Sequence, residues 1–315
     1  MPCGRLTPVF MAFVLAACAD DNELGSGTYE GSHKLRPGDE VTAGASDGQV
    51  AVFTVGSYTV RFSGPTRTFS ESKFGITNTV VTDAWVRVLA APFAGKVNAG
   101  WLSAAAADNA AGVPDILAMA TEYFDGAPLI LDGAFRPLSG DAGYGQDIGA
   151  DWNDFVGITW TYPNGTVDPP ETADAGNLDC SGYVRMLFGY RAGLPMSVGT
   201  PVNNASLPRS SYQMLDWAPG VMVIPYADRQ ATNLSRLRAG DLVFFDTDAD
   251  AVIDHVGFYL GIDTAGHHRM LNSRNSMSGP TMRDGAGAAY GESPAPSILD
   301  GTSYFARGLR AARRL

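Results

Sequence analysis

Alternating apolar and polar positions predict strands in the first third of the chain. In residues 49–63, QVAVFTVGSYTVRFS, successive side chains fall into two alternating sets, which is the period of two expected of a strand. Residues 77–93 repeat the pattern with many β-branched and aromatic side chains, the residue types that favour strands. We therefore expect residues 49–105 to form a small β-rich unit.

Helical spacing replaces this alternation after residue 112. Apolar residues recur every three or four positions within residues 113–128, and again from Ser181 to about Ala192, before Gly193 and Pro195. This spacing predicts two helices, because it places the apolar side chains on one helix face. Three further strands are predicted at residues 240–245, 255–261 and 268–273.

A segment rich in Gly, Asp and Pro separates the two predicted helices. So long a connection inside a domain is usually functional or disordered. Aromatic residues are interspersed in it, so we favour an ordered loop beside a groove, with a plain surface insertion as the alternative. The segment covers residues 127–176, and its aromatic residues include Tyr144, Trp152, Phe155, Trp160 and Tyr162.

The first residues read as an export signal. Arg5 precedes an apolar run that is too short to span a bilayer. The tetrapeptide LAAC that ends at Cys18 resembles the lipobox of bacterial lipoproteins, which implies removal of residues 1–17 and a lipid on Cys18. Residues 18–48 are polar and read as a tether. An ordinary secretory signal is the alternative, and either signal places the mature protein outside the cytoplasm, in the cell envelope.

Composition narrows the classes of partner. The chain has 315 residues, 45% of them hydrophobic, enough for a core without a disulfide scaffold. Its net charge is −11, which argues against nucleic acid because binding to phosphates relies on Lys and Arg. Near the C-terminus stand four arginines, which we expect to be a solvated end: Arg307, Arg310, Arg313 and Arg314.

Cys180 is the candidate nucleophile. The other cysteines, Cys3 and Cys18, belong to the leader, so Cys180 has no evident disulfide partner. It stands at the start of a predicted helix, where peptide dipoles and a nearby imidazolium lower a thiol pKa. The N–H groups of Ser181 and Gly182 are candidates for holding an oxyanion. A buried structural thiol is the alternative.

His255 is the candidate base. It opens the strand 255–261, and a hairpin with its turn at 263–264 pairs it directly with Asn272. Paired residues have Cβ atoms about 5 Å apart, so Asn272 is expected to orient the imidazole, as the third residue does in Cys-His-Asn sites. His267 and His268 are alternatives, because a bulge in the turn would shift the register.

An acidic run precedes this strand. DTDADAVID at residues 246–254 places four aspartates at positions 1, 3, 5 and 9 of a calcium-type loop. Ala251 replaces the glycine of that loop, and Gly257 replaces its last glutamate. We therefore expect a solvated acidic loop and no metal. One cysteine and scattered histidines also disfavour zinc.

Three blocks together resemble a known family. They are LDCSGYVRMLFGYRAGLP (178–195), LRAGDLVFFDTD (237–248) and DHVGFYLG with RMLNSR (254–274). In this order they are similar to the NlpC/P60 superfamily of papain-like bacterial cell-wall cysteine peptidases, over residues 113–315. The resemblance implies an α+β core in which a helix that carries the cysteine packs on an antiparallel sheet.

The resemblance also implies an activity. Cys180 would be the nucleophile, His255 the general base and acid, and Asn272 the orienting residue, without a cofactor. Asp179 and Ser181 match positions that bind the substrate's amino end in relatives. The expected substrate is a peptide bond of a peptidoglycan stem, commonly between D-γ-glutamyl and a diamino acid.

The chain departs from the family where many relatives place a substrate-lining tyrosine. Leu129 stands at that position, so Tyr144, Trp160 or Tyr162 is expected to replace the aromatic ring. Two other functions stay open. One is an amidase or acyltransferase on the same core, and the other is a catalytically silent wall-binding lipoprotein.

Overall fold

The structure of the protein is a computed structural model. It describes residues 35–73, 76–145, 149–199, 205–275, 278–285 and 296–315. The predicted signal peptide, Cys18 and the tether up to residue 34 lie outside the described residues. Residues 35–315 form one compact unit that mixes helices and sheets. No helix among the described residues is long and apolar enough to cross a membrane.

The β-rich unit is an antiparallel sheet in the order β1-β2-β3-β4. Helix α1 (Ala99–Ala110) covers one face of this sheet with Leu102 and Ala106, which pack with Phe53 and Phe62. The sheet begins earlier than expected, because β1 lies inside the predicted tether. The strands are β1 (Glu40–Gly44), β2 (Val50–Thr54), β3 (Thr59–Lys73) and β4 (Ile76–Val88).

A second, six-stranded sheet has the order β13-β12-β11-β10-β14-β9, and all its pairs are antiparallel. The three strands predicted after residue 239 are its β10, β11 and β12. The strands are β9 (Val221–Ile224), β10 (Leu242–Phe245), β11 (His255–Ile262), β12 (His268–Arg274), β13 (Gly279–Thr281) and β14 (Leu309–Arg314).

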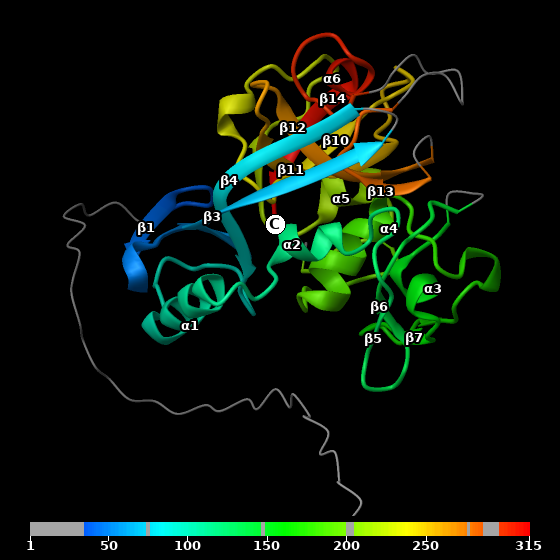
Figure 1. Cartoon of the computed structure of the whole chain (residues 1–315), viewed down its shortest axis with the longest axis horizontal. Helices are drawn as coiled ribbons and strands as arrows, with labels where there is room; N and C mark the ends of the chain where they lie inside the picture. Colours follow the sequence, from blue (N-terminus) through cyan, green and yellow to red (C-terminus); the bar gives the residue numbers. More distant parts are fainter. Residues whose placement is uncertain (1–34, 74–75, 146–148, 200–204, 276–277, 286–295) are drawn as a thin grey trace, which may run out of the picture. The chain divides into compact units, whose positions relative to one another are not determined.

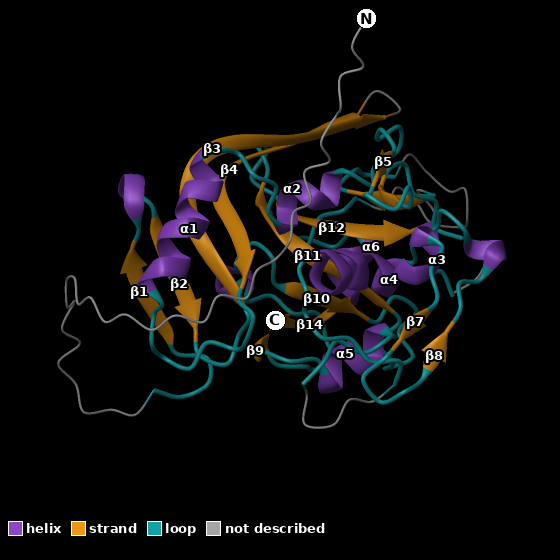
Figure 2. Ribbon diagram, turned by 90° about the horizontal axis from the view of Figure 1, so that it is seen from below, coloured by secondary structure: helices purple, strands orange, loops and turns teal. Residues whose placement is uncertain are grey.

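Both faces of this sheet are buried, so its central strands are apolar almost throughout. In β10, Leu242 and Phe244 face one core, whereas Val243 and Phe245 face another, as the alternation of side chains in a strand requires. Helix α4 (Cys180–Val184) packs on the first face, against β11 and β12 (Figure 2). Helices α2 (Ile116–Thr121) and α6 (Tyr304–Gly308) lie on the first and second face respectively.

The predicted second helix is built in two parts. Asp179 caps α4 by accepting a hydrogen bond from the Gly182 N–H, and after Val184 the helix continues as a π-helical segment over Arg185–Arg191. The long segment 127–176 contains short ordered elements, as favoured from its aromatic residues. The remaining elements are β5 (Ile130–Leu131), β6 (Pro137–Ser139), α3 (Trp152–Val156), β7 (Trp160–Thr161), β8 (Val167–Asp168) and α5 (Ser211–Trp217).

The hairpin β3–β4 extends from its own sheet toward β13 (Figure 1). Near its tip, buried Glu71 accepts hydrogen bonds from the Thr281 hydroxyl (2.9 Å) and the Met282 N–H (2.8 Å), and it pairs with Arg283 (3.0 Å). The β-rich unit is therefore fastened to the edge of the second sheet by ionic and polar contacts.

The C-terminal arginines are not a solvated end, which corrects the prediction. Three of them lie in β14 and are buried: Arg310, Arg313 and Arg314. Arg314 donates to both carboxylate oxygens of Asp241 (2.8 and 3.0 Å) and to Glu40 (2.7 Å). Three arginines among the six residues of β14 suggested a polar tail, but the whole strand is buried. The acidic partners of these arginines come from distant parts of the chain.

Replacing Arg314 with Ala is expected to lower the free energy of unfolding by about 3–5 kcal/mol. The change leaves the Asp241 carboxylate buried without its partner, which is the costly way to break a buried ion pair. Urea unfolding measures the loss. The matched control is Arg307→Ala in α6. Because the Arg307 side chain is exposed, we expect this variant to change the free energy of unfolding by less than about 0.5 kcal/mol. Equal losses in both variants would contradict the importance of the pair.

Candidate active site

Cys180 lies at the tip of α4, against the start of β11. Its side chain is buried, with 3% exposed, and the backbone N–H groups of Val256 and Ser181 lie near enough to the sulfur to lower the thiol pKa. Val256 directly follows His255 in β11. The nucleophile and the base predicted from sequence therefore come from adjoining elements.

His255 and Asn272 are in contact, as predicted. Atom Nδ2 of Asn272 lies 3.2 Å from Nε2 of His255, and both side chains are buried. The imidazole also packs against the rings of Phe245 and Phe305, with centroids 5.8 and 5.2 Å away. Phe245 and Phe305 belong to the core on the second face of the sheet, whereas Cys180 packs in the core on the first face.

The register behind this contact differs from the predicted one. Phe258 pairs with Leu271 and Tyr259 with Met270, and a bulge then shifts the pairing before Ile262. A Cβ added to Gly257 would lie 3.0 Å from Cβ of Asn272. Asn272 thus reaches His255 diagonally across the sheet, a distance that its side chain spans.

The two alternative histidines have other partners. Nδ1 of His268 is 2.8 Å from the Tyr259 hydroxyl. Nδ1 of His267 is 2.7 Å from Asp300, which raises the pKa of this exposed histidine. The contacts of Asn272 make it the third residue of the candidate site.

Burial controls the resting protonation of the pair. It raises the pKa of the Cys180 thiol to about 12, and the charge of Asp179 acts in the same direction. It lowers the pKa of His255 to about 3, and Arg274 lowers it further. Both groups are therefore neutral at pH 7. Burial thus opposes the lowering of the thiol pKa expected at a helix start, because desolvation outweighs the dipoles of a five-residue helix.

Asp179 and Ser181 are engaged by Arg209, which the sequence analysis missed. Arg209 donates from Nη2 to Asp179 (2.7 Å) and from Nη1 to the Ser181 hydroxyl (2.7 Å). The Gly182 N–H donates to Asp179 (2.7 Å), so it is not free to hold an oxyanion as predicted. Arg209 lies far from Cys180 in the sequence and in no recognisable motif, so no local signal marked it.

The structure separates the three candidate aromatic residues. Tyr144 is close enough to Cys180 for the two acidic groups to interact, and burial is the main cause of its raised pKa. Trp160 instead packs on Trp152, with ring centroids 5.0 Å apart. Buried Tyr162 bonds to Arg185. Of the three, Tyr144 is the one whose pKa the charge of Cys180 affects.

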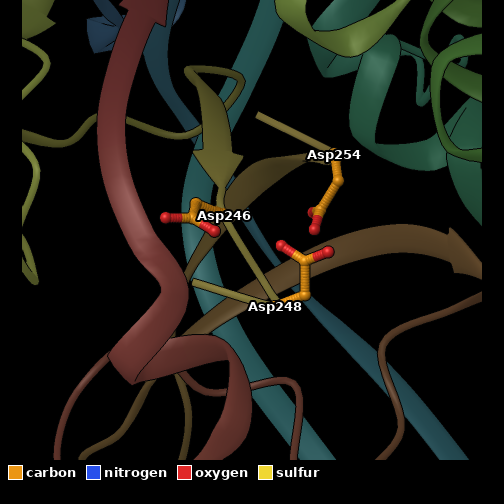
Figure 3. A group of neighbouring side chains, drawn as sticks. All are labelled: Asp246, Asp248 and Asp254. Carbon is orange, nitrogen blue, oxygen red and sulfur yellow. The ribbon is translucent and has the colours of Figure 1, made fainter. Parts of the chain in front are cut away.

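The acidic run is not simply solvated. Asp246 is buried, and its carboxylate gathers with those of Asp248 and Asp254 (Figure 3). Asp250 does not join them. Among the described residues, these three carboxylates are close enough together to hold one metal ion.

Comparison with known proteins identifies the domain that holds this geometry. Residues 161–287 match the model of the NlpC/P60 family. These residues are similar to the NlpC/P60 family. The matched segment includes Cys180, His255 and Asn272. The match indicates that this segment is related to cysteine hydrolases with activity on peptidoglycan.

Other comparisons add little to the NlpC/P60 match. A crystal structure of an NlpC/P60 family protein from Bacillus cereus is 14% identical, over 87% of this chain and 78% of that chain, with a TM-score of 0.27. At this TM-score the likeness carries no argument about the fold. No curated protein matches the chain.

Proposed function

We propose that the protein is a cell-envelope cysteine endopeptidase that hydrolyses peptide bonds in peptidoglycan stem peptides. One observation carries the proposal. The start of β11, the strand that carries His255, lies beside the sulfur of Cys180, and the imidazole of His255 contacts Asn272. A thiol, an imidazole and an orienting amide in this order are the groups that acyl transfer through a cysteine requires.

The neutral resting pair favours general-base catalysis over a preformed ion pair. This step requires the imidazole to turn toward Cys180 from its contacts with Phe245 and Phe305. His255 then takes the proton of the Cys180 thiol as the sulfur attacks the peptide carbonyl carbon. The imidazolium then gives this proton to the leaving amine as the C–N bond breaks, which leaves a thioester. Water attacks the thioester with His255 again as base, and the free carboxylate and thiol are released.

The Asn272 amide directs the imidazole tautomer. Oδ1 of Asn272 is buried and has no hydrogen-bond partner among the described residues. Half a turn of the amide places Oδ1 at the contact with Nε2. The Nε2–H group then donates to Oδ1, and the unprotonated Nδ1 can accept the thiol proton. The amide thereby also stabilises the imidazolium formed during attack.

The finer assignments rest on sequence motifs. The helix-borne cysteine and the antiparallel sheet support a papain-like core, and the motif resemblance supports cleavage between D-γ-glutamyl and a diamino acid. Tyr144 is the proposed aromatic wall of the substrate site. The lipobox supports a lipid on Cys18 and a location at the periplasmic or extracellular face of the cell envelope.

Product analysis tests the proposed activity. Purified peptidoglycan is digested with the protein, and the fragments are identified by mass and by labelling of new termini. We expect one new amino and one new carboxyl terminus for each cut. Transfer of the acyl group to an added amine in preference to water would support an acyltransferase instead. Binding to peptidoglycan without new fragments would support the silent wall-binding alternative.

A further inference from the structure

Three aspartates converge between β10 and β11. Asp246 directly follows β10, and Asp254 directly precedes β11, with Asp248 in the connection between them. One carboxylate oxygen from each lies within 4.8 Å of the others. Figure 3 shows the carboxylates of Asp248 and Asp254 pointing toward one another, with that of Asp246 beside them.

Asp246 supplies a second and independent observation. Its side chain is buried, with 2% of the residue exposed. Oδ2 receives a hydrogen bond from Arg310 at 3.1 Å. Oδ1 has no hydrogen-bond partner among the described residues, and Figure 3 shows one of the two oxygens directed toward the other two carboxylates. A buried carboxylate oxygen without a partner is costly, because it has lost its water and gained nothing in return.

The electrostatics of the group call for a cation. Arg310 offsets one negative charge, which leaves the group acidic. One oxygen of each of the three carboxylates lies within 4.8 Å of the others, so their negative charges repel one another. A cation held by oxygens relieves this repulsion and completes the coordination of the unpartnered Oδ1.

We propose that Asp246, Asp248 and Asp254 bind a Ca²⁺ ion. Calcium takes oxygen ligands at about 2.3–2.6 Å, so ligands on opposite sides of the ion are roughly 5 Å apart, which matches the span of this group. Mg²⁺ needs ligands at about 2.0–2.1 Å in near-octahedral order, a tighter arrangement. The bound ion would tie the end of β10 to the start of β11, one residue before His255. The proposal goes beyond the proposed function and does not depend on it.

Calorimetric titration of the full chain with CaCl₂ tests the site without an activity assay. We expect saturable binding with a Kd of about 0.1–1 mM, the range of extracellular calcium modules. Asp248→Asn and Asp254→Asn should each weaken binding at least about tenfold, because each removes a charged ligand. The matched control is Asp250→Asn, which removes the same charge from the same exposed loop and should change Kd less than about twofold.

Thermal unfolding distinguishes calcium binding by the three aspartates from a purely structural role of their side chains. At about 10 mM CaCl₂ the wild type should unfold roughly 3 °C higher than in EDTA. Asp248→Asn should lose this shift, yet unfold no lower than the wild type in EDTA, because it removes a repelling charge. Absence of saturable binding at about 10 mM, equal weakening by Asp250→Asn, or equal affinity for Mg²⁺ would each overturn the assignment.

Discussion

Cys180→Ser is expected to lower kcat/KM for peptidoglycan cleavage by at least about 10³-fold. The alcohol is a far weaker nucleophile than the thiol, and removal of a nucleophile that acts with a base typically eliminates most of the catalysis. The serine hydroxyl is close in size to the thiol and remains beside the Val256 N–H that lowers the thiol pKa. We therefore expect the loss in the chemical step, with the fold and the binding of peptidoglycan retained.

The measurement is the rate of fragment release, followed by mass, at enzyme concentrations matched by circular dichroism and by midpoint of thermal unfolding. Cys180→Ala serves as the second variant, since it removes the hydroxyl as well. Activity in both variants would show that the sulfur is not used. Activity in the serine variant alone would show that the base can activate an alcohol at this position.

Strands and helices of the second sheet were predictable because their signals are local. The three strand predictions at residues 240–245, 255–261 and 268–273 and the helical spacing after Ser181 each rest on a short stretch of sequence. The structure places strands and a helix at these positions. The β1 strand was missed because Glu40–Gly44 is short and lies in a polar stretch. The β1 strand is stabilised by its hydrogen bonds to β2, and this pairing cannot be predicted from the composition of β1.

The residues of the candidate site could be predicted from the sequence, but their burial and their contacts could not. The motif around Cys180 and the strand that begins at His255 locate both groups. Their pKa values depend on burial by segments far away in the sequence. Arg209 shows the same limit, because its acidic partners Asp151 and Asp179 are brought to it only by the folded chain.

The hairpin between β11 and β12 shows how a correct residue can follow from an incorrect register. The bulge between Tyr259 and Gly261 changes which residues face each other, and no turn motif in the sequence indicates it. Asn272 was still found, because an asparagine side chain also reaches a diagonal neighbour on the same face. A shorter side chain at this position would not have reached the imidazole.

Replacing His255 with Gln is expected to lower kcat/KM by about 10²–10⁴-fold, the usual contribution of a general base. The same variant should change the pH dependence of stability. The folded pKa of His255 is lowered to about 3 by burial, against an unfolded value of about 6.5. Folding therefore favours the neutral ring, and the stability that this ring contributes is present above pH 6.5 and is lost as the pH falls.

The size of the pH effect follows from linkage. Between pH 7.5 and pH 5 the wild type should lose about 2 kcal/mol of unfolding free energy through this histidine, at about 1.4 kcal/mol per pH unit below the unfolded pKa. His255→Gln should lack this loss in urea unfolding at the two pH values. The control is His267→Gln: Asp300 raises the pKa of His267, so its contribution has the opposite sign. The same pH dependence in wild type and His255→Gln would show that the folded protein admits a charged imidazole, and the neutral resting pair would then be wrong.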